Sequence, residues 1–554
     1  MSLPGAGTDV SEAAPVGGAP SPAHPGAPRV ADRRAMVVRL FSHAAIWVVI
    51  LVPTVTELAR GWRALQDDAT ISLRSYQVLS LHPPLLGQFS TASYWSGHTL
   101  FDPGPLLYWL LTVPVHLDPT RGGMWGAALC CGLVLSVAVE AVWSTGYRLG
   151  AAVVAVAVAD LAWTLPEAFA HLIWNPYFGL VFLAASLAIG WAVATGSFGW
   201  WPVLVFTASV AAQAELIYAI LAVALVVVSP VLGLLLGQRA GRRRWIWTGI
   251  GVGAVCWVAP VIQQVAGSPG NLALTLDAHG KQAVAGITFG FRSLALAGSP
   301  SPIWLIHGAG LSNLARFDQH SPVAGAVVLG LIAAITLVAG RTGRRPLAAL
   351  AGTGLVSSAV VVYTFAEVPA AHTVNLVFLM YFLWVVGIVL WAVVAWAALE
   401  VIRAALRAAA QPGEARRRLV RPDTGMVIGG SVVVCALAGV GVAGLGGLSA
   451  QARIQTDGYQ IAQLGHLVSG VENAVPAGPV AIVLRPDLGS STAFSRQFSY
   501  GTGAGWALTA DGWQPALPPA FTAATGVAYP QGPDSPTVTV TILGTRVISV
   551  VRTR

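Results

Sequence analysis

MVVRLFSHAAIWVVILVPTVTELA, residues 36–59, is the first long apolar run of this 554-residue chain. A transmembrane helix needs about 20 predominantly apolar residues. The core of a signal peptide is shorter than this run, and no clear cleavage site follows it. The stretch therefore predicts a retained first membrane span.

The composition of the whole chain agrees with this prediction. Hydrophobic residues make up 55% of it and charged residues only 10%, and the mean hydropathy is +0.69. No soluble domain can bury so much apolar surface, which indicates a polytopic membrane protein. The net charge is +8, but the basic residues stand in short clusters between apolar runs, which is typical of orientation signals and excludes a nucleic-acid surface. The four cysteines fall inside apolar runs, so packing is their expected role.

Runs of suitable length predict about eleven spans. They lie near residues 36–59, 122–145, 150–168, 177–195, 201–217, 218–236, 245–265, 321–340, 346–366, 372–398 and 425–447. The run at 105–117 is short and broken by proline, which predicts a re-entrant or interfacial segment, with a further full span left open. The stretch 201–236 could instead be one broken helix.

The basic clusters orient these spans. They are Arg33-Arg34, GQRAGRRRW (237–245), GRTGRR (340–345) and GEARRRLVR (413–421). The positive-inside rule places all four in the cytoplasm, and eleven spans with a re-entrant 105–117 satisfy every cluster. The outer segments are then 60–121, 171–176, 266–320, 367–372 and everything after about residue 448.

Three regions follow from this layout. Residues 1–35 are rich in Ala, Pro and Gly, which predicts a disordered cytoplasmic N-terminus. Residues 36–448 form the transmembrane region, with its first outer loop at 60–121. Residues 449–554 predict a small extracytoplasmic α/β domain, because strand-like runs at 480–485, 537–543 and 547–551 flank a helical stretch at 500–510. The predicted fold class is an α-helical polytopic membrane protein with a small C-terminal α/β domain.

Two adjacent acids follow the first span, in a chain that uses acids sparingly. Asp67 and Asp68 stand where water can reach a membrane edge. One interpretation is structural, with Asp68 as the N-cap of a helix beginning ATISLRS. The other is functional, with a general base or a metal-binding carboxylate at a membrane–water cleft, where a carboxylate could accept a proton from an acceptor hydroxyl. The deeper acids Glu140 and Asp160 are expected to form hydrogen bonds between helices.

A second stretch in the same loop is FDPGPLLYWLL, residues 101–111. Pro103, Gly104 and Pro105 break the chain, and Tyr108 and Trp109 suit an interfacial depth. The segment either anchors the loop in the membrane or folds back to wall a cleft that holds the two acids.

Together these stretches resemble the GT-C superfamily, integral-membrane glycosyltransferases that use polyprenyl-phosphate-linked sugars. Protein O-mannosyltransferases, lipid A aminoarabinose transferases and actinobacterial arabinosyltransferases belong to it. WNP (174–176) and QAELIY (213–218) are similar to an uncharacterised actinobacterial branch. That branch has His-Pro-Gly-Pro where this chain has DPGP from Asp102, and Gln-x-His where this chain has Gln213-Ala214-Glu215. Both departures change the titratable group.

The resemblance implies an inverting sugar transfer on the outer face of the plasma membrane. Asp67 or Asp68 would be the base, a lipid phosphate the leaving group, and a glycan, a lipid or a protein the acceptor. A phosphate leaving group needs positive charge nearby, for which the candidates are Arg74, Lys281 and Arg292. The expected substrate-cleft residues are His82, His98, Asp102, Tyr108, Trp174, Asn175, Gln213 and Glu215. Members of the superfamily differ in their use of a divalent metal, so Mg²⁺ or Mn²⁺ stays open, and no other cofactor is expected.

Two other functions remain open at this stage. A transporter or flippase of a lipid-linked saccharide would need a polar path at the bilayer midplane, whereas here the polar residues gather near the outer ends of spans. A non-catalytic envelope assembly protein would not depend on the acids. The sequence contains no GxSxG, HExxH, Walker or CxxC motif, so hydrolase, zinc-protease and NTP-driven functions have no support.

Overall fold

The computed structural model describes residues 30–236, 242–279, 283–306, 320–370, 377–409, 458–486, 493–517, 534–543 and 546–554. Within these ranges, eight helices are long and apolar enough to cross a membrane. A small C-terminal sheet accompanies them, so the predicted fold class is confirmed. The predicted span at 425–447 and the basic cluster at 413–421 lie outside the described residues.

Among the described residues, ten helices follow the predicted apolar runs closely, including two that are shorter than a full span. They are α1 (Val30–Ala59), α5 (Gly122–Ser144), α6 (Arg148–Thr164), α8 (Asn175–Ala194), α9 (Trp201–Ala214), α10 (Ala219–Leu235), α11 (Arg242–Ala266), α14 (Pro322–Arg341), α15 (Arg345–Ala366) and α16 (Phe382–Ala409). Shorter helices connect them: α2 (Gln66–Gln77), α3 (Ser93–Ser96), α4 (Leu106–Leu117), α7 (Pro166–Ala170), α12 (Asn271–His279) and α13 (Ile287–Ala297). Single 3₁₀ turns lie at η1 (Phe198–Trp200), η2 (Leu216–Tyr218), η3 (Ile303–Leu305) and η6 (Val377–Met380).

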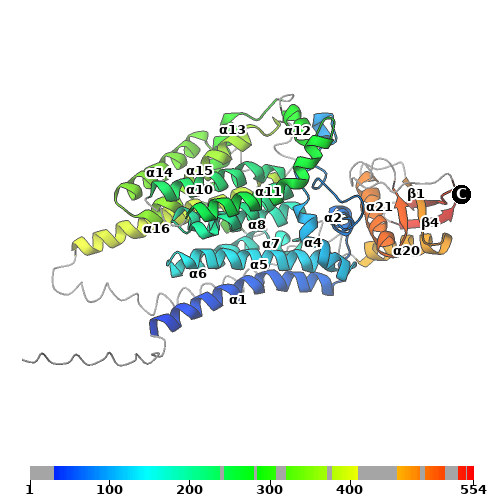
Figure 1. Ribbon diagram of the computed structural model, residues 1–554, viewed down its shortest axis with the longest axis horizontal. Helices are drawn as coiled ribbons and strands as arrows, with labels where there is room; N and C mark the ends of the chain where they lie inside the picture. The colour runs from blue at the N-terminus through cyan, green and yellow to red at the C-terminus, as the bar shows by residue number, and fades with distance from the viewer. Residues whose placement is uncertain are drawn as a thin grey trace, which may run out of the picture.

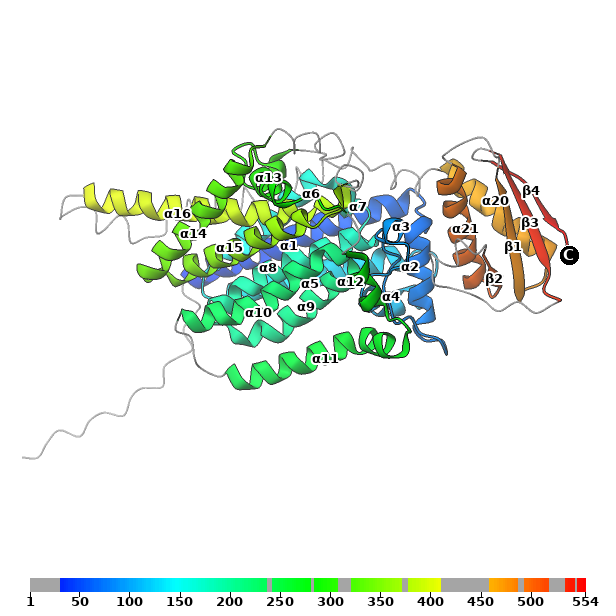
Figure 2. The same ribbon diagram turned by 90° about the horizontal axis from the view of Figure 1, so that it is seen from above.

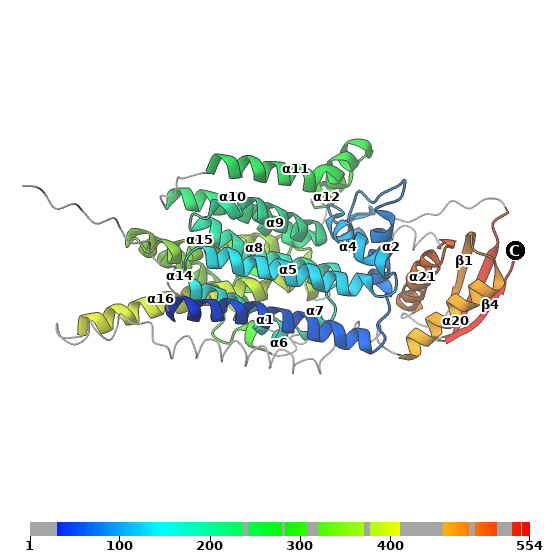
Figure 3. The same cartoon turned by 60° about the horizontal axis from the view of Figure 1, so that its bottom comes forward.

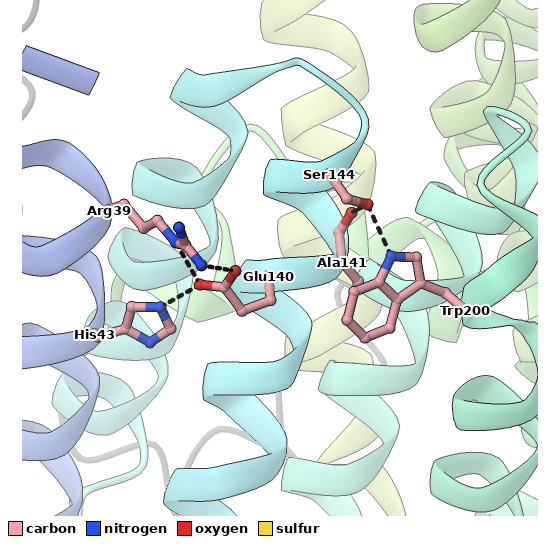
Figure 4. A network of polar contacts seen from close by, with 6 residues as sticks. All are labelled: Arg39, His43, Glu140, Ala141, Ser144 and Trp200. Atoms are coloured by element: carbon pink, nitrogen blue, oxygen red, sulfur yellow. Dashed lines mark hydrogen bonds and ion pairs between the residues drawn. The ribbon is translucent and has the colours of Figure 1, made fainter. Parts of the chain in front are cut away.

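A polar contact joins α1 to α5 within the helical bundle. Arg39 Nε donates to Glu140 Oε1 over 2.7 Å, and His43 Nε2 lies 2.6 Å from the same oxygen. Figure 4 shows both basic side chains of α1 reaching toward Glu140 on α5. The predicted inter-helix role of Glu140 is confirmed. Asp160 on α6 is buried, but among the described interactions its carboxylate makes no hydrogen bond to another helix, so that prediction is not confirmed.

Two ambiguous stretches are resolved by packing. The segment 201–236 is not one broken helix: α9 and α10 are separate and pack against each other, with Glu215 in the turn between them. The run at 105–117 forms α4, a single helix of 12 residues that contains Pro114. At 1.5 Å per residue it is about 18 Å long, too short to cross the roughly 30 Å hydrocarbon core, so the further full span is wrong.

Three boundaries differ from the predicted ones. The first helix begins at Val30, before its apolar run. The predicted span 372–398 is shifted, because α16 runs from Phe382 to Ala409. The segment 266–320, read as a loop, contains α13, which packs against α14 and α15.

The C-terminal domain contains α20 (Gly458–Ala474), β1 (Pro479–Pro486), α21 (Ala493–Ala510), β2 (Gln514–Ala516), β3 (Thr537–Leu543) and β4 (Arg546–Arg552). The strand order is β2-β1-β3-β4. β1 pairs in parallel with β2 and β3, and β3 pairs antiparallel with β4. All three predicted strands and the helix between them are confirmed.

The arrangement places the segment 60–121 against this domain. Figures 1 and 2 show the sheet at one end of the molecule, with α21 between the sheet and α2. Figure 3 shows the start of α1 and the end of α16 at the opposite end of the helical bundle. The acids of α2 therefore lie between the membrane helices and the C-terminal domain.

Candidate active site

The first turn of α2 carries both acids. The helix begins at Gln66, and the backbone carbonyl of Leu65 accepts hydrogen bonds from the N–H groups of Asp68 and Ala69. The N-cap position is Leu65, and no side chain caps this end. The N-cap interpretation of Asp68 is therefore wrong. Both acids lie inside the first turn, where the positive end of the helix dipole favours carboxylates.

Asp68 is fully buried and contacts His171. Its Oδ2 lies 2.6 Å from His171 Nε2, and the two side chains are 0% and 1% exposed. His171 belongs to the short segment between α7 and α8. The expectation that water reaches both acids is wrong for Asp68, because the bundle closes over it. A carboxylate this deep needs such a partner, since burying an unpaired charge is costly.

Asp67 is half-buried and is held by two neutral donors. Its Oδ2 accepts a hydrogen bond from Trp174 Nε1 over 2.9 Å, and its Oδ1 accepts one from Gln88 Nε2 over 3.2 Å. Burial raises the pKa of Asp67, the Trp174 hydrogen bond opposes this, and the neighbouring Asp68 raises it further. A carboxyl group with a raised pKa is a stronger base when ionised.

A polar chain leads from Asp67 to Arg74. Gln88 Oε1 accepts from the hydroxyl of Tyr108 over 2.9 Å. The Arg74 guanidinium lies over the Tyr108 ring, 5.9 Å from its centroid. Such a cation–π contact fixes the guanidinium in position. Asp67 and Arg74, both on α2, are thus linked through Gln88 and Tyr108.

A second acidic group surrounds Asn175 at the start of α8. Asn175 Nδ2 lies 3.3 Å from Asp102 Oδ2, 3.4 Å from Glu215 Oε2 and 2.9 Å from the Ala214 carbonyl. The Leu216 N–H also donates to Asp102 Oδ1 over 3.2 Å. Burial raises the pKa of Asp102 well above its usual value, and repulsion from Glu215 adds to this. Burial raises the pKa of Glu215 to about 8, with repulsion from Asp67 adding to it.

Gln213 ties the DPGP turn to a neighbouring helix. Its Oε1 accepts from the Leu106 N–H over 3.3 Å, and its Nε2 donates to the Cys256 carbonyl over 2.8 Å. Leu106 is the first residue of α4, and Cys256 lies in α11. The segment that follows DPGP is therefore held against the bundle, as the folding-back interpretation predicts.

Most of the residues expected at a cleft come together here. The group comprises Asp67, Asp68, Arg74, Asp102, Tyr108, Trp174, Asn175, Gln213 and Glu215. Trp174 acts here as a hydrogen-bond donor, a role that an interfacial anchor would not need.

Three expected residues are not brought into this group, and a fourth lies outside the described residues. His82 is exposed beyond the end of α2. His98 Nε2 lies 3.6 Å from Asp277 Oδ2, toward α12. Arg292 stands on α13, which lies away from α2 in Figures 1 and 2. Lys281 lies outside the described residues.

Two residues of the group were missed from the sequence. His171 is the partner of Asp68, and Gln88 bridges Asp67 to Tyr108. His171 opens the outer segment HLIWNP, so its place beside Trp174 and Asn175 was a usable signal. Gln88 stands in an unremarkable loop, and nothing in its spacing indicates its contacts.

The fit of a divalent metal can be tested on the side chains. Mg²⁺ and Mn²⁺ prefer carboxylate oxygens, and four carboxylates occur here, on Asp67, Asp68, Asp102 and Glu215. Among the described residues, however, no three His, Cys, Asp or Glu side chains converge closely enough to hold a metal ion. The described side chains therefore do not fit a resident metal, and no step is derived through one.

Gly87 lies so close to Asp102 and Gly104 that a side chain at this position would not fit. A Cβ atom at this position would lie 2.8 Å from Asp102 Cβ and 2.8 Å from the Gly104 carbonyl oxygen. We expect Gly87→Ala to lower the free energy of unfolding by about 1–3 kcal/mol, the usual cost of overpacking. Thermal unfolding in detergent, followed by tryptophan fluorescence, measures this. Gly330→Ala, where a Cβ meets nothing within 4 Å, is the control and should not be destabilised.

The raised pKa of Glu215 predicts an unusual pH dependence of stability. The folded protein keeps this proton up to a pH of about 8, whereas the ordinary value is 4.5. Between these values the folded state binds more protons than the unfolded state, so stability falls as the pH rises. We expect the unfolding midpoint to drop between pH 5.5 and 8, and Glu215→Gln to reduce that drop. A midpoint that rises over this range in the wild type would contradict the assignment.

Comparisons with known proteins give structural neighbours only. No family model matches the chain, and no curated protein matches it. Among solved structures, the chain is similar to ArnT from Cupriavidus metallidurans bound to undecaprenyl phosphate, with 14% identity, a TM-score of 0.48 and coverage of 91% of this chain and 93% of that one. It is also similar to the oligosaccharyltransferase AglB from Archaeoglobus fulgidus, in complex with an inhibitory peptide and a dolichol-phosphate. That match has 10% identity, a TM-score of 0.31 and coverage of 89% of this chain and 65% of that one.

Proposed function

We propose that this protein is a GT-C-type inverting glycosyltransferase that moves a sugar from a polyprenyl phosphate to a hydroxyl acceptor. The observation that carries the proposal is the setting of Asp67. It is half-buried in the first turn of α2, held by Trp174 and Gln88, and next to the buried Asp68. The GT-C-like motifs of the first outer loop support the same reading.

The reaction needs one base and one leaving group. Asp67 removes the proton from the acceptor hydroxyl while the acceptor oxygen attacks C1 of the donor sugar. The new C1–O bond forms on the face opposite the phosphate, and the old C1–O bond breaks with its electron pair leaving on the lipid phosphate. A single displacement inverts C1, so no covalent enzyme intermediate and no second carboxylate nucleophile are needed.

The neighbours of Asp67 prepare its carboxylate for this step. Trp174 and Gln88 each donate one hydrogen bond, which fixes the orientation of the group. A carboxylate accepts at about four lone-pair sites, so two hydrogen bonds leave capacity for the substrate proton. We assign the base to Asp67 and a positioning role to Asp68, because Asp68 is fully buried against His171.

We assign the lipid phosphate to Arg74. Arginine binds phosphate through two parallel N–H donors, and Arg74 is connected to Asp67 through Tyr108 and Gln88. In this arrangement the leaving phosphate lies near the last turn of α2, which carries Arg74. Lys281 lies outside the described residues and Arg292 stands on a separate helix.

Arg74→Lys tests this assignment, because lysine keeps the charge but loses the two-pronged geometry. We expect kcat/KM for the donor to fall at least about tenfold, which corresponds to the loss of one charge-assisted hydrogen bond. Transfer is measured as a function of donor concentration. Arg121→Lys changes an exposed arginine between α4 and α5 and should leave kcat/KM unchanged. Equal kinetics in the two variants would rule out Arg74.

The proposed orientation places this site outside the cytoplasm. The N-terminal helix begins at the end opposite the C-terminal domain in Figure 3, and the basic residues that start α11 and α15 belong to clusters that the positive-inside rule assigns to the cytoplasm. The N-terminus is then cytoplasmic, and the C-terminal domain and the acids face the outer side of the plasma membrane. The domain divisions at about 35 and 448 remain part of this proposal.

The direct test is transfer in isolated membranes. Membranes that carry the wild type are incubated with a panel of polyprenyl-phosphate sugars, and the release of free polyprenyl phosphate is measured, which requires no knowledge of the acceptor. We expect release from at least one donor above the level of empty membranes, and release that is about 10²–10⁴-fold slower with Asp67→Asn. If every donor stays intact, the transferase proposal fails. Transport of a lipid-linked saccharide, measured in vesicles, is then the function to test.

A further inference from the structure

The C-terminal domain takes part in the first turn of α2. Leu65, the residue before the helix, is 0% exposed and belongs to the apolar core of that domain, with Leu464, Leu467 and Tyr500. Its backbone carbonyl holds the N–H groups of Asp68 and Ala69. One residue thus has its side chain in the core of the domain and its carbonyl in the turn that carries the acids.

The next residue is held in an uncommon conformation. Gln66 has φ +51° and is the sole non-glycine residue with positive φ among those described. A left-handed conformation is unfavourable for an ordinary residue, so its surroundings must hold it. Gln66 Nε2 donates to Ser499 Oγ over 2.8 Å, and Ser499 lies on α21 of the C-terminal domain.

The C-terminal domain also contributes a side chain to the core of the membrane bundle. Trp506 on α21 is 4% exposed and belongs to the core of the membrane bundle. Its ring meets Tyr76 edge-on at 5.7 Å, and Tyr76 stacks on His116 of α4 at 4.4 Å. The loop contributes Leu65 to the core of the domain, and the domain contributes Trp506 to the core of the bundle. Helix α21 therefore contacts α2 at its beginning, through Gln66, and near its end, through Tyr76.

From these contacts we infer that the C-terminal domain positions the base. Leu65, Gln66, Ser499 and Gly503 are positioning residues: they set the backbone of the turn that aims Asp67, although none of them touches the reacting atoms. The domain is then a fixed part of the active site and not an independent binding module. The inference rests on the proposed function for its catalytic consequence, but the docking itself does not.

Gly503 offers a substitution that acts chiefly on this contact. A Cβ atom there would lie 2.6 Å from Leu65 Cδ2, so Gly503→Ala must displace Leu65. Gly505→Ala is the matched control, because its Cβ meets Leu517 of the same domain at 3.1 Å and does not contact α2. Leu65→Ala removes the side chain that the new methyl group would meet, so the two changes should be non-additive.

The experiment uses the full-length chain and two readouts. Hydrogen exchange followed by mass spectrometry reports on the amides of Asp68 and Ala69, and transfer kinetics give kcat and KM for the donor. In Gly503→Ala we expect faster exchange at the first turn of α2 and a kcat at least about tenfold lower with KM little changed, since near-attack geometry is lost while donor binding is kept. Gly505→Ala should match the wild type. The Leu65→Ala/Gly503→Ala pair should be no worse than Leu65→Ala alone.

Unchanged exchange in Gly503→Ala would overturn the inference, as would faster exchange with an unchanged kcat. The failure of the proposed function looks different. A wild type that transfers no sugar refutes the transferase proposal, while the exchange comparison alone still decides whether the C-terminal domain holds the first turn of α2.

Discussion

Asp67→Asn is expected to reduce sugar transfer by about 10²–10⁴-fold, the usual contribution of a general base. Asparagine keeps the size of the side chain and can still accept one of the two hydrogen bonds, from Trp174 or from Gln88, but it cannot take up the acceptor proton. The measurement is the initial rate of transfer with saturating donor. Because the pKa of Asp67 is raised, wild-type transfer should also decline on acidification earlier than an ordinary aspartate would allow.

Two other acids serve as comparisons for this result. Asp511→Asn changes an exposed carboxylate of the C-terminal domain and should leave transfer unchanged. Asp68→Asn should reduce transfer less than Asp67→Asn, because Asp68 is sealed from substrate by burial. If Asp68→Asn abolished transfer while Asp67→Asn retained it, the base would be Asp68 and the assignment made here would be wrong.

His171→Ala is expected to destabilise the protein by about 3–5 kcal/mol, the cost of leaving the buried carboxylate of Asp68 without its partner. The change takes the imidazole away from Asp68 Oδ2, at 2.6 Å, where both side chains are almost completely buried. A lower unfolding midpoint in detergent, with loss of transfer, is the expected result.

The double variant separates the pair from simple loss of packing. Asp68→Asn removes the buried charge that His171→Ala would strand, so Asp68→Asn/His171→Ala should be more stable than His171→Ala alone. If the double variant is less stable by the sum of the two single effects, the two residues do not act as a pair.

The membrane helices were predictable because they depend on the length of a continuous apolar run. Twenty apolar residues in sequence have few alternatives to a spanning helix, so α1, α5 and α8 lie almost where the hydropathy places them. The strands of the C-terminal domain were predictable for a similar reason, since runs such as 537–543 alternate and are rich in Val, Ile and Thr. Helix α13 was missed because it is apolar but only 11 residues long, too short to stand out as a membrane span.

The acids were predictable and their environments were not. The position of Asp67 and Asp68 after the first span indicates a site. The hydrogen-bond partner of the buried Asp68, however, is His171, which is 103 residues away in the sequence. Local pattern also suggested an Asp68 N-cap, whereas the tertiary contacts of Leu65 and Gln66 with α21 start the helix earlier. Long-range contacts of this kind leave no mark on periodicity or spacing.

The central claim is that one carboxylate drives one displacement at C1. The anomeric configuration of the transferred sugar tests it most directly, by NMR of the product made from a donor of known configuration. We expect the wild type to form the product with the configuration opposite to that of the donor, and Asp67→Asn to form little of it. A product that keeps the configuration of the donor would contradict it, because retention requires a second displacement that this site is not proposed to perform.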